Sequence, residues 1–327
     1  MKTSLGPNVT RRILLCAALG VIGVSANAQA FPSKPMRVIA AGVSGGGADI
    51  VARLITDPLA KELGQTAIVE PKPGAAGAIA VNDLLQSPHD GHTLLVGVNS
   101  LVSEIPHAVK LKIDMPKSLQ PIVELGRGGL VLVANPSFPA NNLKELIAYV
   151  KANPGKVSYA SYSPGTLSHV LGLVLNNEAG LDLTHIGYKG STPALTDVMG
   201  NHVPLMFVGV ADATPLIKSG KIKAIAVSAP KRSPLLPGVP TFTELGYPKL
   251  EAQGWFALWC TPNTPVAVQA RLREATLKVL AQQAVRDRLL ELGYEVSSRS
   301  VDEMVAGLKL ESDRVGATLQ SIGFKPE

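Results

Sequence analysis

A serine followed by three glycines, residues 44–47, is the segment of this 327-residue chain with the clearest potential to bind a ligand. It lies between a β-branched run at residues 36–41, which predicts a strand, and an amphipathic pattern at residues 48–63, which predicts a helix. Glycine allows a ligand to approach the main chain closely, and the free N–H groups at a helix N-terminus attract anions. The loop is therefore a candidate anion site, although a tight connection without a ligand would use the same residues.

Two later corners repeat this arrangement with hydroxyl-bearing residues. In residues 161–169, Ser163 is predicted to cap a helix that begins with a proline. Hydroxyl groups here, such as that of Thr166, would bind a carboxylate through charge-assisted hydrogen bonds, although Ser163 could serve as a cap alone. Residues 188–193 again pass from a strand through glycine and hydroxyl residues into a helix, and Lys189 could add a positive charge.

The residues that could support catalysis do not combine into an active site. Gly42 to Gly46 match the G-x-S-x-G pattern of α/β hydrolases, but no earlier strand is available to supply an oxyanion hole. A dinucleotide-binding loop is not expected, because Ile50 stands where its last glycine would fall. The six histidines show no metal-ligand spacing and no pair of carboxylates stands out, so we expect no metal, no cofactor and no catalytic residue. His169 is the one histidine at a candidate corner.

The first thirty residues predict a signal peptide. Lys2, Arg11 and Arg12 precede an apolar run at residues 13–24, and two Ala-x-Ala sequences follow it. The run is too short to span a bilayer, which takes about 20 residues. We expect residues 1–30 to be removed on export to the periplasm, by the Sec route or, because two arginines are adjacent, by the twin-arginine route.

Removal of that segment leaves 297 residues with one cysteine, Cys260, so neither an intrachain disulfide nor a cysteine-based metal site can form. The three basic residues of the segment account for half of the net charge of +6. The remaining positive charge is not clustered, which argues against nucleic acid as a partner and is compatible with an anionic ligand. A chain of this length predicts two lobes, since single cores split beyond about 250–300 residues.

The mature chain alternates β-branched runs with helical patterns, which predicts mainly parallel sheets covered by helices. The expected strands are residues 36–41, 67–69, 93–98, 119–123, 130–134, 157–160, 185–188, 203–207, 224–228 and 254–260. The expected helices are residues 48–63, 77–86, 141–153, 166–179, 193–199, 213–219, 265–283, 284–292 and 301–319. We expect the chain to cross twice between the lobes, so that residues 31–128 and 257–327 form lobe 1 and residues 129–256 form lobe 2.

In their order along the chain, several segments resemble the Bug-type substrate-binding proteins of tripartite tricarboxylate transporters. These segments are residues 31–35 (FPSKP), 45–53 (GGGADIVAR), 70–77 (EPKPGAAG), 90–95 (DGHTLL), 149–156 (YVKANPGK), 188–195 (YKGSTPAL), 231–241 (KRSPLLPGVPT) and 254–258 (GWFAL). Together they extend over nearly the whole mature chain. The resemblance implies an α/β fold of two lobes, a type II-like periplasmic binding protein with its ligand cleft between the lobes, which closes like a Venus flytrap.

The resemblance also implies a receptor for a small organic carboxylate, such as a dicarboxylate, a tricarboxylate or an aromatic acid, and no enzymatic activity. One carboxylate would meet the first glycine loop, and the other end of the ligand would meet loops of lobe 2. The implied ligand-binding residues are Val43, Ser44, Gly45, Gly46, Gly47, Asn99, Ser100, Ser163, Thr166, Ser168, His169, Lys189, Gly190, Ser191 and Thr192. The implied partners are the permease subunits of a tripartite tricarboxylate transporter or a sensor kinase, and we expect a monomer.

Three departures from the family pattern bear on the ligand. Val43 and Ser44 stand where the family often has two prolines, and Ala78 stands where it often has asparagine. Val208 stands where many members carry an aspartate. This last departure argues against an amino-acid ligand, because the ammonium group would lose a partner.

Two other functions stay open on the sequence alone. The protein could be a sensory or interaction module without a small ligand. It could also be a secreted hydrolase that uses Ser44 or Ser163 with His169, although the sequence places no third catalytic residue.

Overall fold

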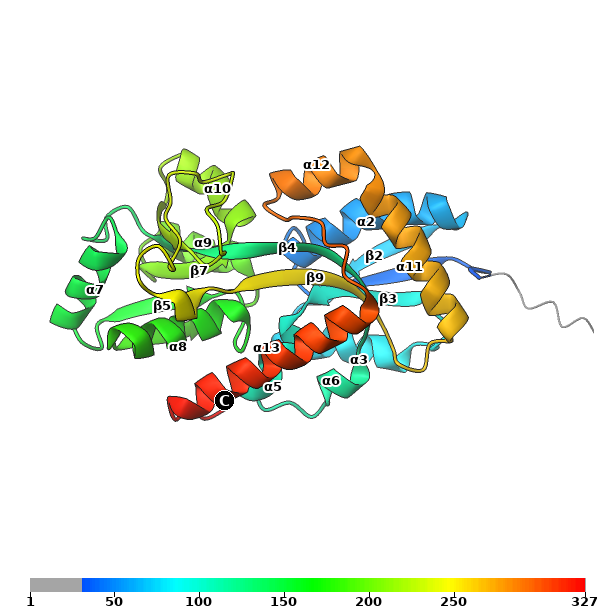
Figure 1. The fold of residues 1–327 in the computed structure, drawn as a ribbon, viewed down its shortest axis with the longest axis horizontal. Helices are drawn as coiled ribbons and strands as arrows, with labels where there is room; N and C mark the ends of the chain where they lie inside the picture. Colours follow the sequence, from blue (N-terminus) through cyan, green and yellow to red (C-terminus); the bar gives the residue numbers. More distant parts are fainter. Residues whose placement is uncertain (1–30, 327) are drawn as a thin grey trace, which may run out of the picture.

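The computed structural model describes residues 31–326 of the chain (Figure 1). The expected signal peptide lies outside these residues. Within them, no helix is both long and apolar enough to cross a membrane. The described chain forms two α/β halves that lie side by side and are joined by two long strands (Figure 1).

The first half is built on three parallel strands in the order β2-β1-β3. These strands are β1 (Met36–Ala40), β2 (Ala67–Pro71) and β3 (Thr93–Val98). Strand β1 lies between the other two and is almost fully buried, as expected for a short run of apolar residues. The crossover segments are α2 (Gly47–Leu63), the 3₁₀ turn η1 (Ala75–Gly77) and α3 (Ala78–Gln86). Helix α2 buries one apolar stripe, including Val51, Ile55 and Leu59, in the core of this half.

Two long strands connect the halves. They are β4 (Gln120–Ala134) and β9 (Gln253–Cys260). Strand β9 runs antiparallel between β3 and β4, whereas the second part of β4 pairs with strands of the other half. Strand β4 therefore belongs to the sheets of both halves, and β4 and β9 together form the link between them.

The second half combines parallel and antiparallel pairs. Strand β5 is parallel to β6 and β7, whereas β7 and β8 are antiparallel to β4. These strands are β5 (Val157–Ser161), β6 (Leu183–Gly187), β7 (Leu205–Gly209) and β8 (Lys223–Val227). The helices of this half are α7 (Leu143–Ala152), α8 (Leu167–Ala179), α9 (Ser191–Met199), α10 (Val210–Lys218) and the 3₁₀ turn η2 (Pro248–Leu250). The sheets are thus mixed, because the connecting strands oppose the direction of their neighbours.

After β9 the chain returns to the first half. The helices that follow are α11 (Val266–Ala281), α12 (Gln283–Glu291) and α13 (Val301–Ser321). Helix α13 lies across both halves (Figure 1). Met304 and Leu308 near its start are buried in the core of the first half, whereas Val315 and Leu319 near its end are buried in that of the second. Helix α13 therefore forms a further bridge between the halves.

The strands predicted at residues 119–123 and 130–134 are parts of one continuous strand, β4. Its glycines do not form a turn. A Cβ atom on Gly126 would lie 2.9 Å from the Cβ of Tyr294, and one on Gly128 would lie 2.6 Å from a backbone carbonyl oxygen. The glycines allow the segment before α13 to approach the strand closely.

The short helices between β3 and β4 were not expected from the sequence. They are α4 (Ser100–Ser103), α5 (Ile105–Ala108) and α6 (Met115–Ser118). Each is too short to show a helical period. Leu101, Ile105 and Met115 in these helices pack into the same core as Trp255 and Trp259 of β9.

Candidate functional site

A cavity of about 530 Å³ lies between the two halves. Its walls include the loops that follow β1 and β3 in the first half and those that follow β5, β6 and β7 in the second. Glycines of the linking strands, Gly128, Gly129 and Gly254, complete the wall. Ligands of α/β proteins bind beyond the carboxyl ends of the strands, and here these ends face one another across the cavity.

The glycine loop presents a free helix N-terminus to this cavity. Gly46 is the N-cap of α2, and no side chain caps the helix. The first N–H groups of a helix have no partner inside the helix, so those of α2 are available to an anion. A Cβ atom on Gly46 would lie 3.1 Å from the carbonyl oxygen of Val43, and one on Gly47 would lie 3.1 Å from the ring of Phe256. A larger residue at either position would thus crowd its neighbours, and glycine leaves this main chain accessible.

Asp49 fixes the shape of the glycine loop. Its Oδ2 atom accepts hydrogen bonds from the N–H of Gly45 at 2.9 Å and from Nε of Arg53 at 3.1 Å. Gly45 has a φ of 72°, in the left-handed region that favours glycine. Asp49 is buried, and its ion pair with Arg53 compensates the charge. The loop is thus held in position by the protein itself.

The corner after β5 differs from the prediction, because Thr166 and not Ser163 is the N-cap of α8. Gly165 has a φ of 77°, so the backbone cannot run as a helix from residue 164. The hydroxyl of Thr166 donates to the carbonyl oxygen of Ser163 at 2.7 Å and tightens the turn. Ser163 and Thr166 both line the cavity.

His169 lies behind this corner rather than in the cavity. Its Nδ1 atom accepts the N–H of Gly165 at 3.1 Å, and its ring stacks on that of His185 with the centroids 3.6 Å apart. Burial lowers the pKa of His169 to about 3, so the ring stays neutral and its Nδ1 atom can accept this hydrogen bond from the backbone. The neighbouring Ser168 donates its hydroxyl to a carbonyl oxygen of β7. Within residues 31–326 no hydrogen bond joins Ser163 to His169, so the pair that a hydrolase would need is not formed.

The third corner joins the two halves directly. Gly190 is the N-cap of α9, has a φ of 128°, and donates its N–H to the carbonyl oxygen of Tyr162 at 2.7 Å. A Cβ atom on Gly190 would lie 2.7 Å from a methyl group of Val43 in the other half. Lys189 lines the cavity with an exposed side chain, and Ser191 lies buried at the start of α9.

The structure divides the ligand-binding residues expected from the sequence into two sets. Those that line the cavity are Val43, Gly46, Gly47, Ser163, Thr166, Lys189, Gly190 and Ser191. Those outside its lining are Ser44, Gly45, Asn99, Ser100, Ser168, His169 and Thr192. Asn99 instead accepts the N–H of Trp255 at 3.0 Å through its Oδ1 atom, and the hydroxyl of Ser100 accepts the N–H of Leu167 at 3.3 Å. Asn99 thus contacts strand β9, and Ser100 contacts the start of helix α8.

Asp212 and Tyr294 are among the polar residues of the lining that were not singled out in the sequence. Asp212 is in the first turn of α10, where an acidic residue is common for reasons of helix stability alone. Tyr294 lies in the irregular segment between α12 and α13, which carries no motif. Burial raises the pKa of Asp212, and a hydrogen bond with Ser191 opposes this shift. Burial, with the negative charge of Asp212 nearby, raises the pKa of Tyr294, so its phenol stays neutral.

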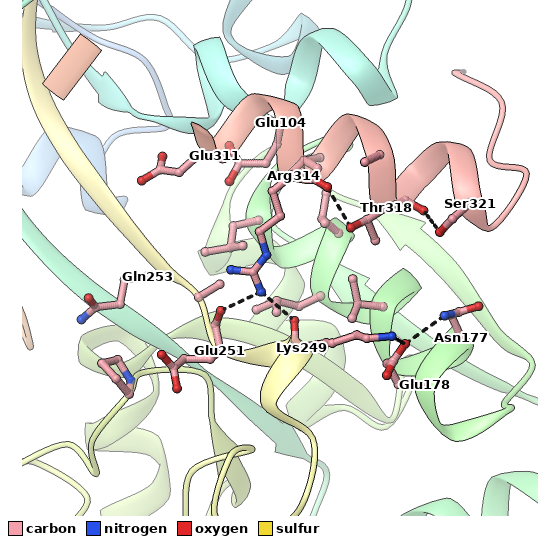
Figure 2. A pocket seen from close by; sticks show the side chains of 18 of the residues that line it. Glu104, Asn177, Glu178, Lys249, Glu251, Gln253, Glu311, Arg314, Thr318 and Ser321 are labelled. Carbon is pink, nitrogen blue, oxygen red and sulfur yellow. Dashed lines mark hydrogen bonds and ion pairs between the residues drawn. The ribbon is translucent and has the colours of Figure 1, made fainter. Parts of the chain in front are cut away.

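A second cavity, of about 470 Å³, lies between α8, α13 and the segment that leads into β9 (Figure 2). Its charged groups are largely paired with one another or with the backbone. Lys249 lies 2.9 Å from Glu178, and Arg314 donates to the carbonyl oxygens of Lys249 and Glu251 at 3.2 and 3.3 Å. Among the described residues that line this cavity there is no glycine, so it is the weaker candidate for an anion site.

The part of the chain from residue 31 to residue 326 contains no group of three or more histidine, cysteine or carboxylate side chains arranged to hold a metal ion.

The sequence matches the family described as "Tripartite tricarboxylate transporter family receptor" over residues 51–324. The periplasmic binding protein BugD is 31% identical, with a TM-score of 0.83 over 91% of this chain and 100% of that chain. MatC of Rhodopseudomonas palustris, solved with bound malate, is 31% identical, with a TM-score of 0.83 over 88% of this chain and 100% of that chain. The R. palustris protein Rpa4515, solved with adipate, is 26% identical, with a TM-score of 0.86 over 91% of this chain and 100% of that chain. The resemblance to Bug-type proteins is confirmed, and the fold is the α/β fold of periplasmic binding proteins.

Proposed function

Because the chain belongs to the tripartite tricarboxylate transporter receptor family, whose members are periplasmic, non-catalytic solute-binding receptors, we propose that it captures a small organic carboxylate between its two halves. We further propose that it delivers this ligand to the permease subunits of a tripartite transporter. The convergence of three strand-to-helix corners on one cavity carries the proposal. Backbone N–H groups at helix N-termini are suited to bind carboxylates, and a receptor requires no catalytic residue.

The proposed mode of binding begins at the glycine loop. One carboxylate of the ligand accepts hydrogen bonds from the uncapped N-terminus of α2 at Gly46 and Gly47. Hydroxyl groups of Ser163 and Thr166 on the opposite side contact the rest of the ligand. Lys110 and Lys189 lie exposed in the lining and give the entrance a positive charge that attracts anions.

Two relatives with known ligands support the class of ligand. MatC was solved with malate and Rpa4515 with adipate, and both ligands are dicarboxylates. Much of the cavity wall here is apolar, including Leu101, Leu130 and Phe256, which suits a ligand with a hydrocarbon body between its polar ends.

The partner that receives the ligand follows from the same family. Delivery to a permease is our first proposal, and delivery to a sensor kinase is the alternative. We also propose that the protein is exported through the Sec or twin-arginine route, is cleaved after residue 30 and is a monomer.

Thermal unfolding of the purified protein with a panel of carboxylic acids tests the proposed function. The protein is first unfolded and refolded to remove any acid carried from the cell. A ligand at 100 times its dissociation constant stabilises the folded state by about 2.7 kcal/mol, which raises the melting temperature by roughly 5 °C. A shift of this size with at least one acid is expected, and no shift with any acid contradicts the carboxylate receptor.

A matched pair of variants then tests the site. Gly47→Val places a branched side chain against Phe256 and across the α2 N-terminus, so binding should be lost. Gly238→Val lies in a surface loop where no heavy atom lies within 4 Å of an added Cβ, so binding should be retained. Equal affinity of both variants for the acid would exclude the glycine loop as the carboxylate site.

A further inference from the structure

The cavity between the halves contains a carboxyl group that no cation of the described chain neutralises. Asp212 lines the cavity in the first turn of α10 and is partly buried. Across residues 31–326, its one hydrogen-bonding side chain is Ser191, and no lysine, arginine or histidine pairs with it. Partial burial of a carboxylate without a cation carries a desolvation cost, so a second role for Asp212 has to be considered.

Asp212 and Tyr294 both lie near Gly209 in the cavity lining. A Cβ atom on Gly209 would lie 3.7 Å from the phenol oxygen of Tyr294 and 3.9 Å from Oδ2 of Asp212. The same phenol oxygen would lie 3.6 Å from a Cβ atom on Gly47. The carboxyl group of Asp212 and the phenol of Tyr294 are therefore neighbours at Gly209, and the phenol also lies near Gly47 at the N-terminus of α2.

Helix stability explains the presence of an acidic residue here but not its position in the cavity lining. An aspartate in the first helical turn interacts favourably with the helix dipole whether it is exposed or buried. Burial adds a desolvation cost and raises the pKa of Asp212, which an exposed residue at the same turn would avoid. Perturbed carboxyl groups in a cleft are typical of functional sites.

We propose that Asp212 selects the ligand by accepting a hydrogen bond from a hydroxyl or ammonium group at the end opposite the carboxylate. The inference rests on the proposed receptor function and narrows its ligand class. The ligand is then a monocarboxylate with an apolar body and a distal hydroxyl or ammonium group. A second carboxylate at this end would meet the negative charge of Asp212, and like charges in a partly buried site repel strongly.

The position of Asp212 also bears on the argument drawn from Val208. That residue of β7 is fully buried and stands where many family members carry an aspartate. From the sequence, its identity argued against a ligand with an ammonium group. In the structure a carboxyl group reaches the cavity four residues later, from α10.

Matched ligands test this inference. Isothermal titration compares two sets of ligands, and the members of each set share one carboxylate and a similar hydrocarbon part. The aliphatic set is adipate, 6-hydroxyhexanoate and 6-aminohexanoate. The aromatic set is terephthalate, 4-hydroxybenzoate and 4-aminomethylbenzoate. We expect a ligand with the distal donor to bind about ten-fold or more tightly than the dicarboxylate of its set, since hydrogen bonds to charged groups are worth this much.

Variants of Asp212 separate selection from folding. Asp212→Asn keeps the shape but removes the charge, so the preference for the distal donor should fall about ten-fold while the melting temperature is unchanged or higher. Asp182→Asn, at an exposed position outside the cavity lining, is the control and should leave the preference unchanged.

Each outcome separates the two proposals. If the wild-type protein binds adipate or terephthalate as tightly as the matched donors, or if Asp212→Asn changes all affinities equally, the role of Asp212 is overturned while the carboxylate receptor stands. If none of the carboxylates binds, the receptor function fails and the selection inference fails with it.

Discussion

Glu104 illustrates how one residue couples the interior of the first half to helix α13. It lies between α4 and α5, is 3% exposed, and accepts a hydrogen bond from the hydroxyl of Ser103. Glu311 of α13 accepts hydrogen bonds from Asn99 at 3.0 Å and from the indole of Trp255 at 3.2 Å. Burial raises the pKa of Glu104 to about 7, and the negative charge of Glu311 adds to this shift. The hydrogen bond from Ser103 opposes it.

The raised pKa of Glu104 predicts a dependence of stability on pH. The folded protein keeps the proton between pH 4.5 and about pH 7, where the unfolded chain has lost it. The contribution of this group to the free energy of unfolding is therefore complete below pH 4.5 and is lost as the pH rises to about 7. Glu104→Gln should reduce the fall in this free energy between pH 5 and pH 8 by about 2 to 3 kcal/mol.

Urea unfolding at the two pH values measures this effect. Glu274→Gln is the control, because Glu274 is exposed and the pKa of its carboxyl is lowered by Lys278, so its proton is already lost at pH 5. An equal pH dependence in the wild-type protein and Glu104→Gln would contradict the prediction.

At the scale of elements, three segments connect the halves: β4, β9 and α13. The strands join the sheets through backbone hydrogen bonds, whereas α13 joins the two apolar cores through side chains. The end of α13 packs against the core of the second half although the helix begins on the first. We infer that α13 limits the relative motion of the halves.

Truncation of a side chain at the end of α13 tests this contact. Leu319 is 3% exposed in the core of the second half, so Leu319→Ala should lower the free energy of unfolding by about 2 to 4 kcal/mol. Leu310 on the same helix is 72% exposed, and Leu310→Ala should change it by less than about 0.5 kcal/mol. Equal effects in urea unfolding would show that the end of α13 is not packed in solution.

At the scale of the whole molecule, the cavity lies where the two halves face each other, and the link of β4 and β9 lies along its wall. We propose that residues 31–128 and 257–327 form one lobe and residues 129–256 the other, with α13 extending from the first onto the second. Gly190 of one lobe then contacts Val43 of the other, and both residues line the cavity. Ligand that touches both lobes favours the state in which this contact is made.

Small-angle X-ray scattering tests this closure. With a saturating acid identified by thermal unfolding, we expect a smaller radius of gyration than in the refolded, ligand-free protein, because the ligand shifts the population toward the closed state. An acid that gives no thermal shift is the control and should leave the scattering unchanged. Identical curves with and without the bound acid would show that binding needs no closure.

The strands and helices that the sequence predicted well are those with a strong local pattern. The apolar run of β1, the amphipathic α2 and the strand β3 follow from periods that neighbouring residues establish among themselves. The glycine loop was likewise evident, because its backbone requirement is local. The ordered family segments then indicated the fold and the class of function.

Other features depend on residues far apart in the chain, and only the tertiary structure decided them. The continuity of β4 depends on its close approach to Tyr294, and the bridging role of α13 depends on two separate cores. Asp212 acquires its significance from burial beside Ser191 and Tyr294, which its own helix does not encode. Local patterns record the conformation of a segment, whereas burial and charge pairing depend on what the rest of the chain places around it.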